Sequence, residues 1–268
     1  MKQSFYMISW TDVFVSLVLI GITIVLLKWW KIGLTKSLMW GTVRSFVQLT
    51  IMGYVLTFFF QQHHWTFMVG LLLLMSLIAS YEGNRRSKDH PIPHYFLILF
   101  GALVFTQIVV LGAILQFILN VEPWYYPYAM IPIAGMIIGN ALNSITLTVN
   151  RFVAEMEHRE AEMEMMLSLG APIRAVAQNS IRAAIKAALL PVLNSMMMVG
   201  LVQIPGVMTG QILAGIDPLI AVRYQIMIMY MWVTSAVIAD ILVLTFIYKQ
   251  FFTSSDQINY TFFRRNSK

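Results

Sequence analysis

Seven long apolar runs dominate this sequence and limit what it can fold into. A hydrocarbon core about 30 Å thick needs roughly 20 apolar residues per helix, and each run approaches or exceeds that length. A chain that is 59% hydrophobic and only 11% charged is not an ordinary soluble domain. The sequence therefore predicts an all-α, polytopic membrane helix bundle with about seven transmembrane helices. Their predicted ranges are 10–29, 38–60, 65–81, 95–119, 127–149, 188–204 and 219–248.

The basic residues are distributed unevenly between the predicted loops. Three follow the first span, three the third, five the fifth and four the seventh, which places 15 of the 18 Lys and Arg on one side. The positive-inside rule then puts the N-terminus outside and the C-terminus in the cytoplasm. We expect a multi-pass protein of the cell inner (plasma) membrane, with the lipid bilayer as its partner. This asymmetry explains the net charge of +6 without a nucleic-acid partner.

The pattern predicts one membrane domain, residues 1–252, followed by a polar C-terminal tail, residues 253–268. The tail is expected to fray beyond about Thr253. Met1–Trp10 lacks a basic n-region, so the first apolar run is expected to remain as a helix. The absence of Cys excludes disulfides, thiolate metal sites and cysteine nucleophiles.

One long polar stretch, Arg151–Arg182, cannot lie in a bilayer. Five glutamates lead into Leu169-Gly170-Ala171-Pro172, and a basic amphipathic stretch and Pro191 follow. We expect a cytoplasmic elbow over residues 151–187, with an acidic helix, a break at Gly170 and a basic helix before the sixth span. Glycine allows a sharp turn, and Pro172 can start the next helix. The alternative is a solvated acidic helix that ends in an ordinary C-cap.

The elbow and two further segments resemble a known family. Glu164 stands six residues before Gly170, as in the E-A-A-x-x-x-G loop of ABC-transporter permeases. Gln203–Gly215, with the residues up to Gln225, is very similar to the signature of the FetB/YbbM permease family, apart from Gln203 and Val207. Arg44-Ser45-x-x-Gln48-Leu49 and Gly139-Asn140-x-x-Asn143 also match that pattern. The resemblance covers residues 35 to 248, nearly the whole membrane domain.

This resemblance implies a permease subunit of an ABC transporter that exports iron or another metal ion; plant relatives are linked to aluminium tolerance. The chain has no G-x-x-x-x-G-K-[ST] motif. It would therefore be no enzyme and carry no cofactor, with ATP and Mg bound by a separate ATP-binding subunit. The implied assembly is a permease homodimer with two ATPase subunits. The residues implied to couple to the ATPase are Glu164, Leu169, Gly170 and Ala171.

The segment 205–215 is predicted to lie at the outer mouth. Its prolines and glycines disfavour a stable helix. It is expected to be a loop that caps the mouth or a re-entrant piece that lines the path. Asp217 and Pro218 are expected to be the N-cap and first residue of the seventh span. The outer-mouth residues are Pro205, Gly206, Met208, Thr209, Gly210 and Gln211.

A polar layer is predicted inside the cytoplasmic half of the bundle. Counting residues from the span ends places polar residues of four spans at similar depth, namely Arg44, Asn143, Asn194 and Asp240, with Gln48 one turn beyond Arg44 and Asn140 one turn deeper than Asn143. Ionisable groups at this depth are costly and should pair. We therefore expect Arg44 to pair with Asp240, and the amides to line a cytoplasm-facing cavity. The alternative is that these groups hydrogen-bond between helices and hold the spans together.

Candidate metal ligands are few. The thioethers of Met196, Met197 and Met198 suit soft cations, although methionine is also a flexible core filler. His158 and Glu162 are four residues apart and could attract cations, although simple solvation and helix-start electrostatics explain them better. The His63–His64 and His90–His94 pairs lack convincing ligand spacing. The sequence alone establishes no iron site.

Two other classes of function compete with the permease. A stand-alone secondary transporter or channel needs a titrating carboxylate in the membrane. Asp240 is the only carboxylate well inside a predicted span, and its expected arginine partner argues against free titration. A seven-helix receptor or an intramembrane enzyme is the third class. The sequence has no G-x-S-x-G, His-Glu metal motif or paired intramembrane aspartates to support an enzyme.

Overall fold

The computed structural model describes residues 9–61, 64–87, 92–253 and 255–260. Within these residues the chain is helical, with two isolated β-bridges and no β-strand. Seven of the described helices are long and apolar enough to cross a membrane, which confirms the predicted all-α, multi-span architecture. They are α1 (Trp10–Trp29), α2 (Thr35–Phe60), α3 (Trp65–Arg86), α4 (Tyr95–Ala113), α5 (Pro127–His158), α7 (Ile173–Met198) and α9 (Pro218–Ile247).

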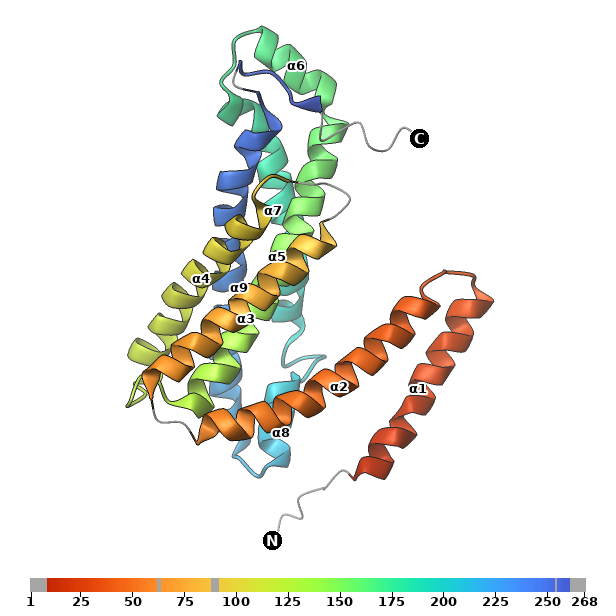
Figure 1. Ribbon diagram of the computed structural model, residues 1–268, viewed down its shortest axis with the longest axis vertical. Helices are drawn as coiled ribbons and strands as arrows, with labels where there is room; N and C mark the ends of the chain where they lie inside the picture. Colours follow the sequence, from red (N-terminus) through yellow and green to blue (C-terminus); the bar gives the residue numbers. More distant parts are fainter. Residues whose placement is uncertain (1–8, 62–63, 88–91, 254, 261–268) are drawn as a thin grey trace.

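Two short helices and two irregular turns complete the chain. Helix α6 (Glu160–Ser168) and helix α8 (Gly206–Leu213) lie at opposite ends of the bundle (Figure 1). Helix α4 continues into a π-helical turn, Ile114–Ile118, and α9 ends in a 3-10 turn, Tyr248–Phe251. The two ends of the bundle are called below the α6 end and the α8 end.

Helix α5 is the centre of the bundle. It contacts α3, α4, α7 and α9. Ala134, Ile137, Ala141 and Ile145 are fully buried at helical spacing, so one face of α5 is a continuous apolar stripe. The small residues in this stripe let neighbouring backbones approach closely, as is common between membrane helices. The bundle is thus organised around one long helix that runs the length of the fold.

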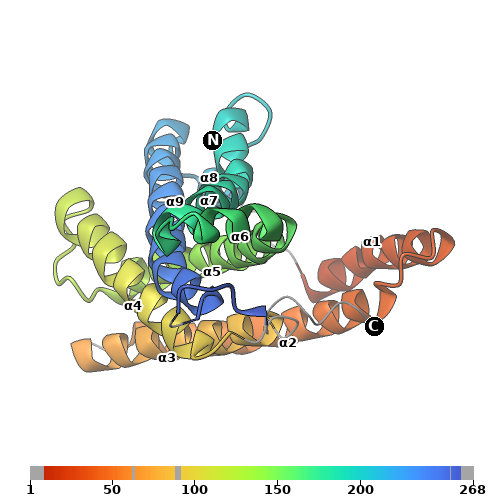
Figure 2. The same ribbon diagram turned by 90° about the horizontal axis from the view of Figure 1, so that it is seen from above.

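Helix α1 and the first part of α2 reach away from the rest of the bundle in both views (Figures 1 and 2), whereas the end of α2 packs against it, with Phe60 stacked on Tyr128 of α5. None of the residues of either helix is buried. Their apolar side chains are compatible with lipid, because acyl chains are as apolar as leucine. The α1–α2 hairpin therefore presents a large apolar surface to the membrane or to another protein.

The sixth span differs most from its predicted range of 188–204. Helix α7 begins at Ile173, continues through Pro191 and ends at Met198. The basic residues Arg174 and Arg182 lie on its exposed side, so they do not interrupt the helix. The opposite side buries Val176, Ala177, Ser180, Ala184 and Ala188. The predicted separate basic helix is therefore the first half of the span itself.

The outer-mouth segment also folds differently from the expectation. Residues Gly206–Leu213 form helix α8 directly after Pro205, and the Thr209 amide donates to the Pro205 carbonyl at 2.9 Å. Gly210 inside the helix costs about 1 kcal/mol, and packing of α8 against α9 opposes this cost. The predicted cap at α9 is confirmed, since the Leu219 amide donates to Asp217 Oδ1 at 2.8 Å and Pro218 is the first helical residue.

The C-terminal tail does not fray at Thr253. Phe252 and Ile258 are buried and form an isolated antiparallel bridge. The Asn259 amide donates to the Phe251 carbonyl at 2.9 Å. Burial of these apolar side chains folds the segment back beside α6, as Figure 1 shows at the end of the chain drawn in dark blue. Residues 261–268 lie outside the described residues.

Candidate functional site

The elbow is built from the end of α5, helix α6 and the start of α7. Helix α5 extends to His158, beyond the predicted span, and Arg159 separates it from α6. The chain then turns at Gly170, whose φ of +82° is in the region that favours glycine. The Gly170 amide donates to the Leu167 carbonyl at 2.9 Å, which closes the end of α6.

Helix α6 is anchored on one side and exposed on the other. Met163 is buried against side chains of α5 and α7. Leu169, in contrast, is 83% exposed. Glu164 contacts the Tyr260 hydroxyl of the C-terminal tail. The elbow therefore presents an exposed leucine at the α6 end of the bundle, on a helix that is fixed to two membrane spans.

The predicted single acidic helix is not continuous, because a break at Arg159 divides it between His158 and Glu162. The Arg159 guanidinium donates to both carboxylate oxygens of Glu162, at 2.9 and 2.6 Å. This hydrogen bond lowers the pKa of Glu162 and raises that of Arg159. The described residues contain no group of three or more His, Asp or Glu that could hold a metal ion. His63 and His90 lie outside the described residues.

The predicted Arg44–Asp240 ion pair is also wrong. Arg44 Nη1 lies 3.3 Å from Glu82 Oε1. Glu82 is in the part of α3 that continues beyond the predicted span, so the sequence offered no reason to place it near Arg44. Arg86 lies 3.8 Å from the same carboxylate and 3.5 Å from the Asn143 Oδ1 atom. Because these groups are partly exposed, each ion pair contributes at most about 1 kcal/mol.

Asp240 instead belongs to a separate polar seam between α5 and α9. Its side chain is fully buried, and Oδ2 accepts a hydrogen bond from Ser144 Oγ at 2.7 Å. Across the described residues, Oδ1 has no hydrogen-bond partner and no Lys or Arg pairs with Asp240. Asn140 Nδ2 donates to the Trp232 carbonyl at 2.7 Å and to Ser235 Oγ at 3.1 Å.

The six residues of the predicted layer therefore do not form one group. Asn140 and Asp240 join α5 to α9, while Arg44 and Asn143 belong to the Glu82 cluster. Gln48 and Asn194 are exposed. The contacts of Asn140 and Asp240 match the alternative in which polar groups hold the spans together.

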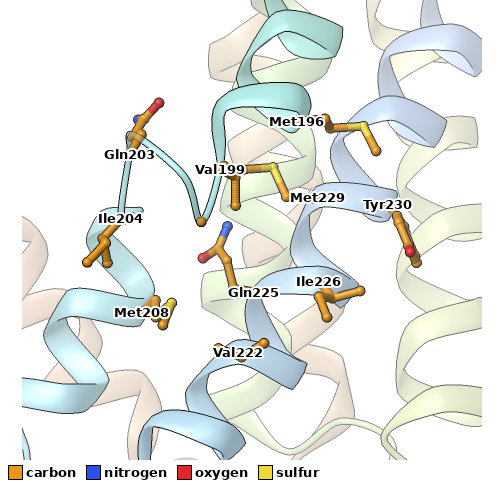
Figure 3. Close-up of a pocket in the computed structure, with 11 residues that line it drawn as sticks. Met196, Val199, Gln203, Ile204, Met208, Val222, Gln225, Ile226, Met229 and Tyr230 are labelled. Atoms are coloured by element: carbon orange, nitrogen blue, oxygen red, sulfur yellow. The ribbon is translucent and has the colours of Figure 1, made fainter.

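A cavity of about 500 Å³ lies at the α8 end, between the end of α7, the following loop, α8 and α9 (Figure 3). The loop is shaped by a β-bridge between Val199 and Gln203 and by Gly200, whose φ is +83°. Three methionines from three different helices line the cavity: Met196 of α7, Met208 of α8 and Met229 of α9. Cavities of this volume with mainly apolar walls are typical of binding sites for small ligands.

Gln225 is the main polar group of this cavity. Its side chain is 3% exposed and projects into the cavity from α9 (Figure 3). Among the described residues, neither its Oε1 nor its Nε2 atom has a hydrogen-bond partner. A buried amide without partners costs about 1–3 kcal/mol. Gln225 lies in the segment that resembles the permease family but was not predicted as a site residue, although a glutamine inside an apolar span is a usable signal.

Two of the six predicted outer-mouth residues line cavities, and each lines a different one. Met208 faces the one that holds Gln225, whereas Gln211 lines a neighbouring cavity of about 560 Å³ with residues of α5 and α9. Of the predicted methionine triplet, only Met196 lines the first cavity. Met197 is 68% and Met198 is 47% exposed.

Comparison with known proteins identifies the family. Residues 10–252 match the model described as "Uncharacterised protein family (UPF0014)". The UPF0014 membrane protein YjkA of Bacillus subtilis is 36% identical over 91% of this chain and 95% of its own length. The probable iron export permease protein FetB of Escherichia coli is 32% identical over 91% of this chain and 92% of its own.

A plant relative is similar over the same part of the chain. The protein ALUMINUM SENSITIVE 3 of Arabidopsis thaliana is 32% identical over 91% of this chain and 87% of its own length. No solved structure matches significantly. The family match and these identities over nearly the whole membrane domain show that this chain belongs to the UPF0014 family of membrane proteins.

Proposed function

We propose that this chain is the permease subunit of an ABC transporter, and that it exports iron or another metal ion with energy from a separate ATPase subunit. The observation that carries this proposal is the elbow, where an exposed leucine caps the end of a short helix that connects two membrane spans. The name of the FetB relative supports a metal ion as cargo. The absence of a P-loop motif in the sequence requires ATP and Mg to be bound by the partner.

In the proposed orientation, the bundle spans the cell inner (plasma) membrane and its α6 end lies in the cytoplasm. The excess of Lys and Arg in the loops of that side supports this orientation. We further propose a permease homodimer with two ATPase subunits. The α1–α2 hairpin, with no buried residue of its own, offers apolar surface for such an assembly.

Helix α7 connects the elbow to the cavity at the α8 end. Its 26 residues extend from Ile173, next to the elbow turn, to Met198, just beyond Met196 of the cavity. Pro191 lies inside the helix and cannot donate a backbone hydrogen bond, so the helix bends most easily there. Movement of α6 by the ATPase would therefore move α7 and change the walls of the cavity. This linkage is the proposed route from ATP hydrolysis to transport.

Leu169→Glu is expected to remove binding of the ATPase subunit, because it places a charge at the centre of the proposed contact. An interface hot spot contributes about 2 kcal/mol, or roughly 30-fold in affinity. The measurement is the amount of a P-loop ATPase, and of ATP hydrolysis, that copurifies with the tagged chain. The matched control is Leu201→Glu, since Leu201 is 88% exposed but lies in the loop at the α8 end. Equal loss in both variants, or no loss in either, would contradict the proposed contact.

One observation favours the alternative function, a stand-alone secondary transporter. Asp240 has no basic partner among the described residues, so the expected arginine no longer argues against a role in proton binding. Reconstitution of the purified chain into vesicles distinguishes the two functions. Transport without nucleotide or ATPase would support this alternative and exclude the permease.

A further inference from the structure

We propose that the cavity at the α8 end binds a soft monovalent cation, Cu(I) or its analogue Ag(I), through the thioethers of Met196, Met208 and Met229. The carbonyl oxygen of Gln225 supplies a fourth donor. This inference rests on the proposed function and names the class of metal ion that the permease carries. It assigns a role to three side chains that are far apart in the sequence and line one cavity in the fold, with Met196 and Met208 on opposite sides of Gln225 (Figure 3).

The donor set selects the cation. Thioethers are soft ligands that favour Cu(I), whereas hard cations favour sites built mainly from carboxylate and carbonyl oxygens, and only one of the four proposed donors is an oxygen. The described residues that line the cavity include no Asp, Glu or His. A bare divalent or trivalent iron ion would therefore enter an apolar site without a compensating negative charge. A weakly hydrated monovalent ion with polarisable ligands does not face this difficulty to the same degree.

Gln225 gives independent support for a ligand. A glutamine that is 3% exposed normally satisfies both its carbonyl and its amino group. Here both atoms lack partners among the described residues, and the side chain is directed into the cavity (Figure 3). A cation held by the three thioethers would satisfy the carbonyl oxygen. Bound water or a counter-anion that accompanies the cation would satisfy the amino group.

The three methionines can close around an ion. The volume of about 500 Å³ exceeds what one cation needs, so the side chains must move when it binds. Methionine has three rotatable side-chain bonds and adapts its shape readily. Met196 and Met208 are attached to α7 and α8 on either side of the Gly200 loop. The cavity therefore contracts when these two helices approach α9, which is the movement that α7 would transmit from the elbow.

Titration of the purified full-length chain with Ag(I) tests the site directly. The Met208→Leu/Met229→Leu double variant is expected to bind Ag(I) about 100-fold more weakly, since even outer-shell changes at metal sites cost 10–100-fold. Leucine conserves volume, so the fold should be retained. The matched control is the Met197→Leu/Met198→Leu double variant, which removes two thioethers of the same α7 helix that lie outside the cavity. This control should bind Ag(I) as the wild type does.

Three outcomes would overturn the inference. Equal Ag(I) affinity in the cavity variant and the wild type would show adventitious binding to other methionines. Equal losses in both double variants would exclude a specific site, and displacement of Ag(I) by equimolar Fe(II) would contradict the proposed selectivity. The circular dichroism and thermal unfolding of each variant establish that it is folded. Because Ag(I) binding needs no ATPase, its failure alongside normal ATPase copurification would reject this site and leave the proposed permease function standing.

Discussion

Replacing Phe152 with alanine is expected to lower the free energy of unfolding by about 3–5 kcal/mol. Phe152 of α5 is fully buried, and its ring meets that of Phe251 edge-on, with centroids 5.2 Å apart. Loss of this ring removes apolar contacts and leaves a cavity where α5 meets the turn after α9. Denaturation of the purified chain by SDS in mixed micelles measures the change.

Phe105→Ala is the matched control for this experiment. Phe105 is 51% exposed on α4, so its truncation should change the free energy of unfolding by much less. A double-mutant cycle of Phe152 with Phe251 should give a coupling of about 0.5–1.5 kcal/mol for the aromatic pair. A loss at Phe152 no larger than that at Phe105, or no coupling with Phe251, would contradict the packing at the α6 end.

Asp240→Lys is expected to prevent stable folding, whereas Asp240→Asn is expected to remain within about 1 kcal/mol of the wild type. A lysine at this buried position would place an unpaired ammonium among apolar side chains, and an intramembrane charge costs about 2.5–3.5 kcal/mol even on insertion scales. Asparagine keeps an oxygen for the Ser144 hydroxyl and removes the charge. Its amide can also donate to Thr148, which faces the same carboxylate from α5.

The yield of monodisperse protein and the free energy of unfolding in SDS report the outcome at Asp240. If both variants failed to fold, the fold would need the negative charge of Asp240 and a cation to balance it. That result would contradict the description of the α5–α9 seam as a set of hydrogen bonds. If the Asn variant folds, its transport activity becomes informative. Loss of nucleotide-free transport in a folded Asn variant would point to the secondary transporter.

The number and approximate ranges of the spans could be predicted because each is a long apolar run. Helix α1 begins and ends where the sequence predicts. Helix α7 could not be predicted in the same way, because a hydropathy window reads its first half as polar. Its basic residues lie on one exposed side, and the buried alanines of the other side give only a weak hydrophobic signal. A window of average hydropathy therefore fails to locate the ends of spans that are amphipathic.

The polar contacts between helices could not be predicted from the sequence, because they depend on which helix ends face each other. Counting depth along each span placed Arg44 and Asp240 at one level but gave no information on their angular positions. The true partner of Arg44 is Glu82, which lies beyond the predicted end of its span. The cap at Asp217 was predictable, since it depends on residues within a few positions of one another.

The methionine cavity could not be predicted from the sequence for a similar reason. Met196, Met208 and Met229 are separated by more than a helical turn and lie on three helices, so no spacing rule relates them. The sequence indicated the triplet Met196–Met198 instead, although Met197 and Met198 are exposed and do not line the cavity. The loop at Gly200 and the unexpected helix α8 place the three methionines in the walls of one cavity.

The most direct measurement for the central claim uses single-cysteine variants, since the chain contains no Cys. Leu169→Cys and Leu201→Cys place thiols at highly exposed positions near the α6 end and the α8 end, respectively. In intact cells a membrane-impermeant maleimide should label the Leu201→Cys variant and not the Leu169→Cys variant. In inverted vesicles the Leu169→Cys variant should be labelled, but only after the ATPase subunit has been removed. Labelling of the Leu169→Cys variant from outside the cell, or labelling in inverted vesicles that bound ATPase does not reduce, would contradict the proposal that the elbow is the cytoplasmic contact of an ATPase.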